Sequence, residues 1–278
     1  MNTAYRSRIA PSPTGYMHLG HARTFWIAQQ RCRSQNGTLV FRNEDIDTAR
    51  ARPEYVTAML EDLRWFGLEW QEGPDCGGPH QPYSQSQRLP LYKQALDQLI
   101  ISGALFPCIC TRQDVLRSTN APHAGEDEPL YPGTCHNLKL AEIPSGKHFN
   151  WRFKVPNAQT ITFNDGNFGE QHYLANRDFG DFIIWRHDGL PSYQLAVTVD
   201  DAAMQITEVV RGADLLKSTA RQLLLYQALN LSPPRFYHCE LLRDEQGRRL
   251  AKRHDSLSLR QLRQNGKTPE ELRAQIFN

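Results

Sequence analysis

The first hundred residues alternate between short β-rich runs and helical stretches, and this alternation limits the folds open to the chain. Residues 5–10 and 38–42 have the composition of short strands. Apolar residues recur at helical spacing over 19–32, and a second helix is predicted to start near Pro53 and to end before Gly67. Strand, helix, strand, helix is typical of a parallel sheet, so we expect an α/β fold.

The alternation stops after a further helix at 89–102 that Gly103 ends. Residues 106–175 hold several cysteines, many prolines and glycines and short β-like runs, so they are interpreted as an insertion. Beyond it the periodicity predicts strands at 181–185 and 206–210, helices at 193–203 and 213–230, and a loop-rich strand segment with a short helical tail from Ser232 onward.

Composition excludes several classes of protein. The 278 residues carry a formal net charge of +2, which argues against a coat protein that binds nucleic acid without specificity. No apolar run approaches the roughly 20 residues of a membrane helix, and the N-terminus becomes polar too early for a signal peptide. We therefore expect a cytoplasmic protein without membrane contact, in which the six cysteines are thiols or metal ligands.

The turn between the first strand and the first helix contains His18, Gly20 and His21. A glycine-bearing turn at a helix N-terminus favours anions, because backbone N–H groups and the helix dipole face the ligand. Two histidines three residues apart share one helix face, from which both imidazoles can donate to a phosphate. The alternative is a histidine pair that is buried in the core.

The stretch "RIAPSPTGYMHLGHA" resembles the first signature of the class I aminoacyl-tRNA synthetases, whose core is His-Ile-Gly-His. Their second signature is a basic loop, and "RRLAKRHD" (248–255) resembles it, with Lys252 in the key position. Alone, the second stretch could be a solvated charge run. Together the two stretches imply that His18, Gly20, His21 and Lys252 bind ATP, and that both histidines and the lysine are catalytic.

The resemblance is closest to the glutamyl branch of that family. It places an extended first motif, Glu44, Tyr193 and Arg211 around the substrate amino acid. Glutamate needs guanidinium groups for its carboxylates, a carboxylate for its amine and a hydroxyl to fix the geometry, and this set supplies them. The motif residues assigned to glutamate are Arg8, Ile9, Ala10, Pro11 and Ser12.

Two positions depart from the family pattern. Val197 stands near a place where an asparagine is usual, which predicts weaker amino-acid affinity. Ala251 replaces a serine of the lysine loop and removes one hydroxyl donor. Neither change removes a charge, so we expect activation to survive. Asp200 and Asp201 match a family pair and are interpreted as structural.

The inserted region predicts a metal site. Cys108, Cys110 and Cys135 come from two close segments, and three thiolates suit a tetrahedral structural zinc. The alternative is a group of buried thiols. For the fourth ligand the resemblance to short glutamyl-type enzymes favours the phenolate of Tyr131. His136 is chemically commoner, but its adjacency to Cys135 makes chelation by both residues awkward.

Only a short tail follows the lysine loop, where the full-length glutamyl enzymes continue into an anticodon-binding region. The chain therefore resembles truncated members of the branch, the glutamyl-queuosine tRNA(Asp) synthetases. This resemblance implies a doubly wound Rossmann-type sheet with ATP, as its magnesium complex, at the switch point. It also implies that glutamate is activated without tRNA and passed to queuosine in tRNA(Asp).

We predict a catalytic domain in two halves, 1–105 and 176–231, which flank the zinc-bearing insertion 106–175. A lysine-loop segment and a helical tail follow at 232–278, and no anticodon-binding domain is expected. We expect a monomer. The alternatives are a short glutamyl-tRNA synthetase that charges a 3′ end, a nucleotidyltransferase with the same H-x-G-H phosphate site, and a non-catalytic RNA-binding relative.

Overall fold

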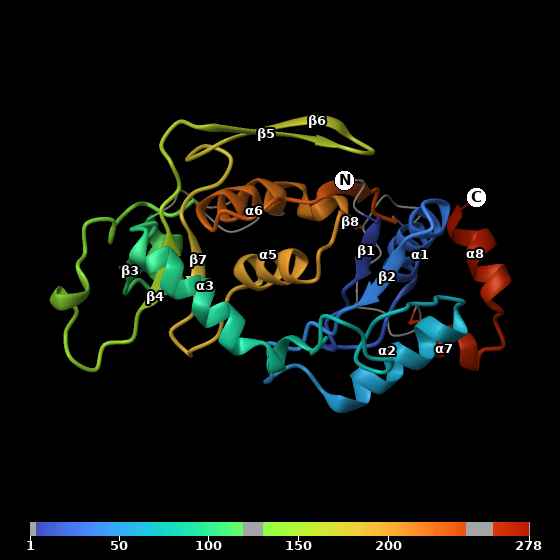
Figure 1. Ribbon diagram of the computed structural model, residues 1–278. Helices are drawn as coiled ribbons and strands as arrows, with labels where there is room; N and C mark the ends of the chain where they lie inside the picture. The colour runs from blue at the N-terminus through green and yellow to red at the C-terminus, as the bar shows by residue number, and fades with distance from the viewer. Residues whose placement is uncertain (1–3, 119–129, 243–257, 278) are drawn as a thin grey trace.

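The computed structural model describes residues 4–118, 130–242 and 258–277. Its central strands confirm the α/β fold with a parallel sheet (Figure 1). Strand β1 (Arg6–Ile9) pairs in parallel with β2 (Thr38–Phe41), and β8 (Glu208–Gly212) pairs in parallel with β9 (Arg235–Cys239). The two pairs meet where Thr207 N–H donates to the Arg6 carbonyl at 2.9 Å.

The predicted helices connect these strands. They are α1 (Leu19–Ser34), α2 (Pro53–Trp65), α3 (Leu89–Ile101), α5 (Tyr193–Ala203) and α6 (Leu216–Ala228). Helices α1 and α5 begin at the predicted residues, and the predicted start of α6 is instead a short 3-10 turn, η3 (Ala213–Leu215). Further 3-10 turns are η1 (Gln85–Gln87) and η2 (Leu140–Glu142). The tail forms the two short helices α7 (Leu259–Gln264) and α8 (Pro269–Phe277).

A second sheet is antiparallel and takes one strand from outside the predicted insertion. Strands β3 (Leu105–Cys108), β4 (Asn150–Phe153) and β7 (Phe182–Trp185) form it, with α4 (Arg112–Ser118) after β3. Strand β7 was predicted to belong to the second catalytic half, 176–231, yet it pairs with β4 of the predicted insertion. In this register Phe182 lies opposite Phe153, and their ring centroids are 5.3 Å apart. The domain boundaries themselves stay a prediction.

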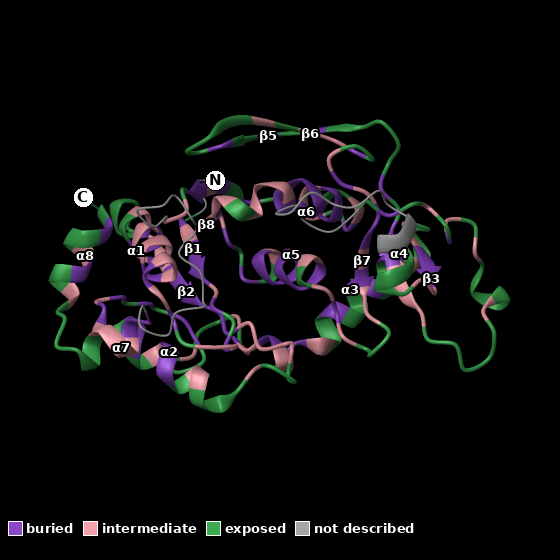
Figure 2. Ribbon diagram, turned by 180° about the vertical axis from the view of Figure 1, so that it is seen from behind, coloured by how far each residue is buried: buried purple, intermediate pink, exposed green. Residues whose placement is uncertain are grey.

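The remaining strands form a hairpin of β5 (Thr160–Asp165) and β6 (Gly169–Leu174) that crosses over α6 (Figure 1). It joins the parallel strands at one position, where Asp165 pairs with Phe236 of β9. Figure 2 shows that buried residues concentrate on α5 and on the central strands, whereas much of the hairpin is exposed. Among the described residues, no helix combines the length and apolarity needed to cross a bilayer.

The end of α1 differs from the prediction in one detail. The helical periodicity covers 19–32, but the helix continues to Ser34, and Asn36 rather than the nearby Gly37 takes the left-handed conformation, with φ 48°. Gly37 has another role, because a Cβ atom there would lie 2.5 Å from the Tyr5 ring and 2.6 Å from the Tyr5 carbonyl oxygen. This position therefore requires a glycine so that two backbone segments can approach.

We expect Gly37→Ala to lower the free energy of unfolding by about 1–3 kcal/mol, the usual cost of overpacking. Chemical denaturation measures this loss. Gly15→Ala is the matched control, because a Cβ atom there meets no atom within 4 Å, and it should change stability by less than about 0.5 kcal/mol. Equal stability of the two variants would contradict the role assigned to Gly37.

Candidate active site

The carboxyl ends of the four parallel strands surround one cavity of about 570 Å³. In open α/β sheets this edge is where ligands bind. Most of the predicted site residues line the cavity, and they come from the first loop, α1, α5 and the ends of β2 and β8. They are Arg8, Ala10, Pro11, Ser12, His18, Gly20, His21, Glu44, Tyr193 and Arg211. Ile9 does not line the cavity, because its side chain lies in the core behind it.

His18 and His21 lie together at the N-terminus of α1. Their ring centroids are 3.7 Å apart, so the two imidazoles share one face as predicted. His18 caps the helix, and its Nδ1 accepts the Gly20 N–H at 3.1 Å. The Gly20 N–H was expected to face the ligand, and it is instead occupied by this cap. Because Nδ1 accepts, the neutral imidazole of His18 carries its proton on Nε2.

The lysine-loop signature lies outside the described residues, and so do Lys252 and Ala251. Its two flanks reach the same cavity. Leu242, on the near side, lines the cavity. On the far side Ser258 forms an antiparallel bridge to His18, and Leu259 N–H donates to the Met17 carbonyl at 2.7 Å.

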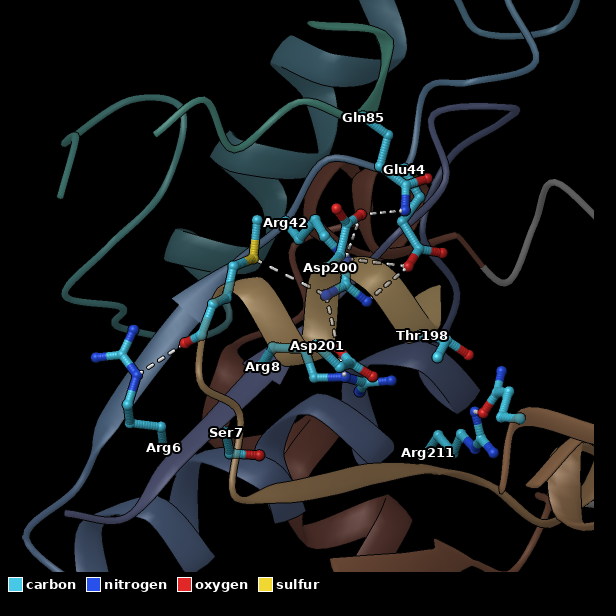
Figure 3. A network of polar contacts seen from close by, with 12 residues as sticks. Arg6, Ser7, Arg8, Arg42, Glu44, Gln85, Thr198, Asp200, Asp201 and Arg211 are labelled. Carbon is cyan, nitrogen blue, oxygen red and sulfur yellow. Dashed lines mark hydrogen bonds and ion pairs between the residues drawn. The ribbon is translucent and has the colours of Figure 1, made fainter. Parts of the chain in front are cut away.

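A buried cluster of charged residues lies at the part of the cavity that contains Arg8 and Glu44 (Figure 3). Arg42, which is 0% exposed, donates from Nη1 to Asp201 Oδ1 at 2.6 Å and from Nη2 to Glu44 Oε1 at 3.0 Å. Arg8 donates to the same Asp201 oxygen at 3.2 Å and to the Val210 carbonyl at 3.1 Å. Arg8 and Glu44 are thus fixed by one pair of charges.

The contacts of Asp200 agree with the interpretation that it is a structural residue. Its carboxylate accepts from Arg88 Nε at 2.6 Å, from Gln85 Nε2 at 2.7 Å and from the Tyr92 hydroxyl at 2.9 Å. These partners tie α5 to α3 and to the turn before it. Asp200 is fully buried and does not line the cavity.

The charges of this cluster set two pKa values in opposite directions. Burial raises the pKa of Glu44, although Arg42 and Arg8 oppose the change. Burial also acts to raise the pKa of Asp201, but the guanidinium groups of Arg42 and Arg8 outweigh it and hold that pKa below its usual value. A cation bound beside Glu44 would favour the carboxylate form of that residue.

Arg211 lies across the cavity from this cluster and is 4% exposed. It donates from Nη1 to Gln222 Oε1 at 2.9 Å, from Nη2 to Thr219 Oγ1 at 2.7 Å and from Nε to His238 Nε2 at 3.1 Å. Tyr193, the first residue of α5, is 40% exposed and lines the cavity.

Sequence reasoning missed several residues that shape this site. Arg42 directly follows the buried strand β2, and an arginine at such a position was a usable signal. His238, Thr219 and Gln222 carried no comparable signal, because their contacts to Arg211 depend on the packing of β9 and α6.

The three predicted cysteines form a second cluster that could hold a metal. The sulfur atoms of Cys108, Cys110 and Cys135 all lie within 4.8 Å of one another. The Tyr131 hydroxyl lies 3.4 Å from Cys108 Sγ and 3.7 Å from Cys110 Sγ. Tyr131 therefore completes a four-atom group of ligand types that suit a tetrahedral ion.

His136, the alternative fourth ligand, faces another partner. Its Nε2 atom is hydrogen-bonded to the carboxylate of Asp181. Asp181 also accepts the Val155 N–H at 2.8 Å, so the carboxylate is held in place. The geometry therefore favours Tyr131 over His136.

Comparison with known proteins supports the same family. The family model for tRNA synthetases class I (E and Q), catalytic domain, matches residues 4–277. A protein of Nitratidesulfovibrio vulgaris named Glutamyl-Q tRNA(Asp) synthetase is 49% identical over 94% of this chain and 82% of its own length. A protein of the same name from Symbiobacterium thermophilum is 47% identical over 95% and 82% of the two chains.

A solved structure shows the same fold. The glutamate-tRNA synthetase of Elizabethkingia anophelis superposes with a TM-score of 0.79 and is 31% identical, over 90% of this chain. The present chain spans about half of that synthetase, 53% of its length. The sequence relatives and the family model together show that this chain belongs to the class I tRNA synthetases of the E and Q type, and that it is an aminoacyl-tRNA synthetase-like ligase.

Proposed function

We propose that this enzyme activates L-glutamate with ATP in the absence of tRNA and transfers the glutamyl group to queuosine in the anticodon loop of tRNA(Asp). The observation that carries the proposal is that one cavity is lined by Arg8, Glu44, Tyr193 and Arg211 and by the His18–His21 pair. The names of the relatives at 47–49% identity support queuosine as the acceptor.

Each charge of glutamate has a partner in this cavity. Glu44 receives the α-ammonium group, Arg8 lies on the side of the α-carboxylate, and Arg211 receives the side-chain carboxylate. Tyr193 supplies a hydroxyl that fixes the substrate. The backbone of 9–12 forms the wall beside the amino acid, with Ala10, Pro11 and Ser12 facing the cavity.

Activation joins the α-carboxylate of glutamate to ATP. A carboxylate oxygen attacks the α-phosphorus, the bond to the bridging oxygen of the β-phosphate breaks, and pyrophosphate leaves with Mg²⁺. His18 donates from Nε2, and His21 and Lys252 add positive or donor groups along the phosphates. A Cβ atom at Gly20 would lie 3.0 Å from the His18 ring, so the glycine leaves this imidazole its place at the start of the helix.

Transfer then needs an acceptor hydroxyl beside the adenylate carbonyl. Queuosine carries a ring diol that resembles the vicinal hydroxyls of a terminal ribose. A hydroxyl oxygen of this diol attacks the carbonyl carbon, the bond to AMP breaks, and the hydroxyl proton is lost. Holding the hydroxyl in near-attack geometry is the main requirement for this step.

The first expected result is ATP–pyrophosphate exchange that depends on glutamate and needs no RNA. His21→Ala should lower the exchange rate by roughly 10²-fold or more, since it removes a preorganised donor to the transition state. The dissociation constant for glutamate should change little, because His21 lies outside the amino-acid set. Exchange that starts only on addition of tRNA would contradict activation without RNA.

We also propose that the cysteine cluster binds one structural zinc ion, with Tyr131 as the fourth ligand. Metal analysis should find about one zinc per chain, and Cys110→Ser should lose both the metal and thermal stability. Cys76→Ser is the matched control, because Cys76 is exposed and lies outside the cluster. If freshly prepared wild-type protein contains no metal and Cys110→Ser melts at the same temperature as the wild type, the cluster is a group of buried thiols.

The acceptor is tested with labelled glutamate and tRNA(Asp) that contains or lacks queuosine. We expect label only on the modified tRNA, and removal of its 3′-terminal adenosine should leave labelling intact. The name of the E. anophelis structure favours one alternative, a glutamyl-tRNA synthetase that charges a 3′ end. Label that disappears with the 3′ adenosine would establish that alternative. The proposal includes a monomeric, cytoplasmic enzyme.

A further inference from the structure

The guanidinium group of Arg211 is oriented by acceptors along one edge. Its Nε–H points to His238 Nε2 at 3.1 Å, and Nη2 donates to Thr219 Oγ1 at 2.7 Å. These two acceptor atoms are 3.2 Å apart, so they match the side of the guanidinium that carries Nε and Nη2. A hydrogen bond from Nη1 to Gln222 Oε1 at 2.9 Å adds a third constraint.

Three of the five guanidinium N–H groups are thereby engaged over short distances. The other two lie on Nη1 and Nη2, of which Nη2 makes a 3.5 Å contact to the Leu215 carbonyl. Arg211 itself lines the cavity. Its terminal edge is therefore the one that a carboxylate can bind with two parallel hydrogen bonds.

The contact between Arg211 and His238 determines which ring nitrogen of the imidazole carries the proton. A guanidinium Nε can only donate, so Nε2 of His238 must accept and cannot carry a proton. The ring proton then lies on Nδ1, which is 2.6 Å from Asp165 Oδ2. Burial and the charge of Arg211 lower the pKa of His238 to about 4, in agreement with a neutral ring.

Asp165 is fixed in turn by backbone groups. Its Oδ1 accepts the N–H groups of Asn167 at 3.1 Å and Phe168 at 3.0 Å. Its Oδ2 accepts the backbone N–H of His238 at 3.1 Å and faces Nδ1 of the same residue. Asp165 ends β5 and His238 lies on β9, and the side chains of both are 0% exposed. The chain of contacts thus runs from the β5–β6 hairpin to the cavity.

We propose that His238 and Asp165 are positioning residues that set the orientation of Arg211 for the side-chain carboxylate of the amino-acid substrate. Asp165 holds His238 as the Nδ1–H tautomer, and the Nε2 lone pair of His238 directs the terminal edge of Arg211 into the cavity. This inference rests on the proposed function, in which that substrate is glutamate.

The first test compares two replacements of His238 by pyrophosphate exchange. His238→Met keeps bulk but removes the nitrogen acceptor, and it should raise the KM for glutamate roughly 10-fold or more, the scale for losing a hydrogen bond to a charged group. The KM for ATP should stay unchanged. His238→Gln can present its amide oxygen to Arg211, so it should restore most of the affinity for glutamate.

The second test changes the tautomer of His238 by a substitution at Asp165 that keeps the volume of the side chain. In Asp165→Asn the amide oxygen is needed by the N–H groups of Asn167 and Phe168, and the His238 N–H, which lies 3.3 Å from Oδ1 in the wild type, can use the same oxygen. The amide nitrogen therefore faces the His238 ring and donates to Nδ1. The ring must then carry its proton on Nε2, against the N–H of Arg211. We expect a raised KM for glutamate, an unchanged KM for ATP, and an Nε2–H ring in nitrogen-15 NMR where the wild type shows Nδ1–H.

The double variant Asp165→Asn/His238→Met isolates the route of the effect. If Asp165 acts through the imidazole, its replacement should have no further effect on the KM for glutamate once the imidazole is gone. An Asp165→Asn enzyme with the wild-type KM, or an equal loss in both backgrounds, would overturn the inference while leaving the proposed function intact. A wild-type enzyme without glutamate-dependent exchange would overturn both.

Discussion

The part of the cavity that contains Arg8 and Glu44 depends on one interaction, the buried ion pair of Arg42 and Asp201. Arg42 follows β2, and Asp201 lies on α5, so their contact joins two halves of the chain that are far apart in sequence. Removing one partner of such a pair leaves an uncompensated charge in the core, which is more costly than losing an exposed pair. The same two residues hold Arg8 and Glu44. The contacts that stabilise the fold therefore also hold the two side chains that we propose to bind the amino acid.

This arrangement explains how a small cavity can hold several charged side chains before a ligand arrives. Arg8 and Glu44 keep their positions because Asp201 and Arg42 already satisfy part of their hydrogen-bonding capacity. Arg211 is held in the same manner by neutral acceptors, so its positive charge is left for a ligand. Preorganised charges of this kind lower the cost of ordering the site when the substrate binds.

The part of the cavity beside His18 and His21, where we propose that the phosphates bind, is organised by other interactions. His18 caps α1 with one ring nitrogen and keeps the other as a donor, beside the positive end of the helix. The antiparallel sheet and the cysteine cluster lie apart from this chemistry, although the hairpin that follows them supplies Asp165 to the back of the pocket. The predicted insertion at 106–175 therefore reaches the residues behind Arg211 through one buried carboxylate.

The sequence by itself determined the parallel α/β fold, the main helices and the side chains that meet in the cavity. These features depend on local periodicity, on turn chemistry and on two motifs that are each continuous in sequence. The contacts of Arg42, Thr219, Gln222 and His238 were decided only by the tertiary structure, and so was the pairing of β7 with β4. The physical reason is that a hydrogen bond between residues distant in sequence leaves no local pattern, because it depends on which buried faces pack together. Even the tautomer of His238 follows from partners that the fold brings from β5 and β8.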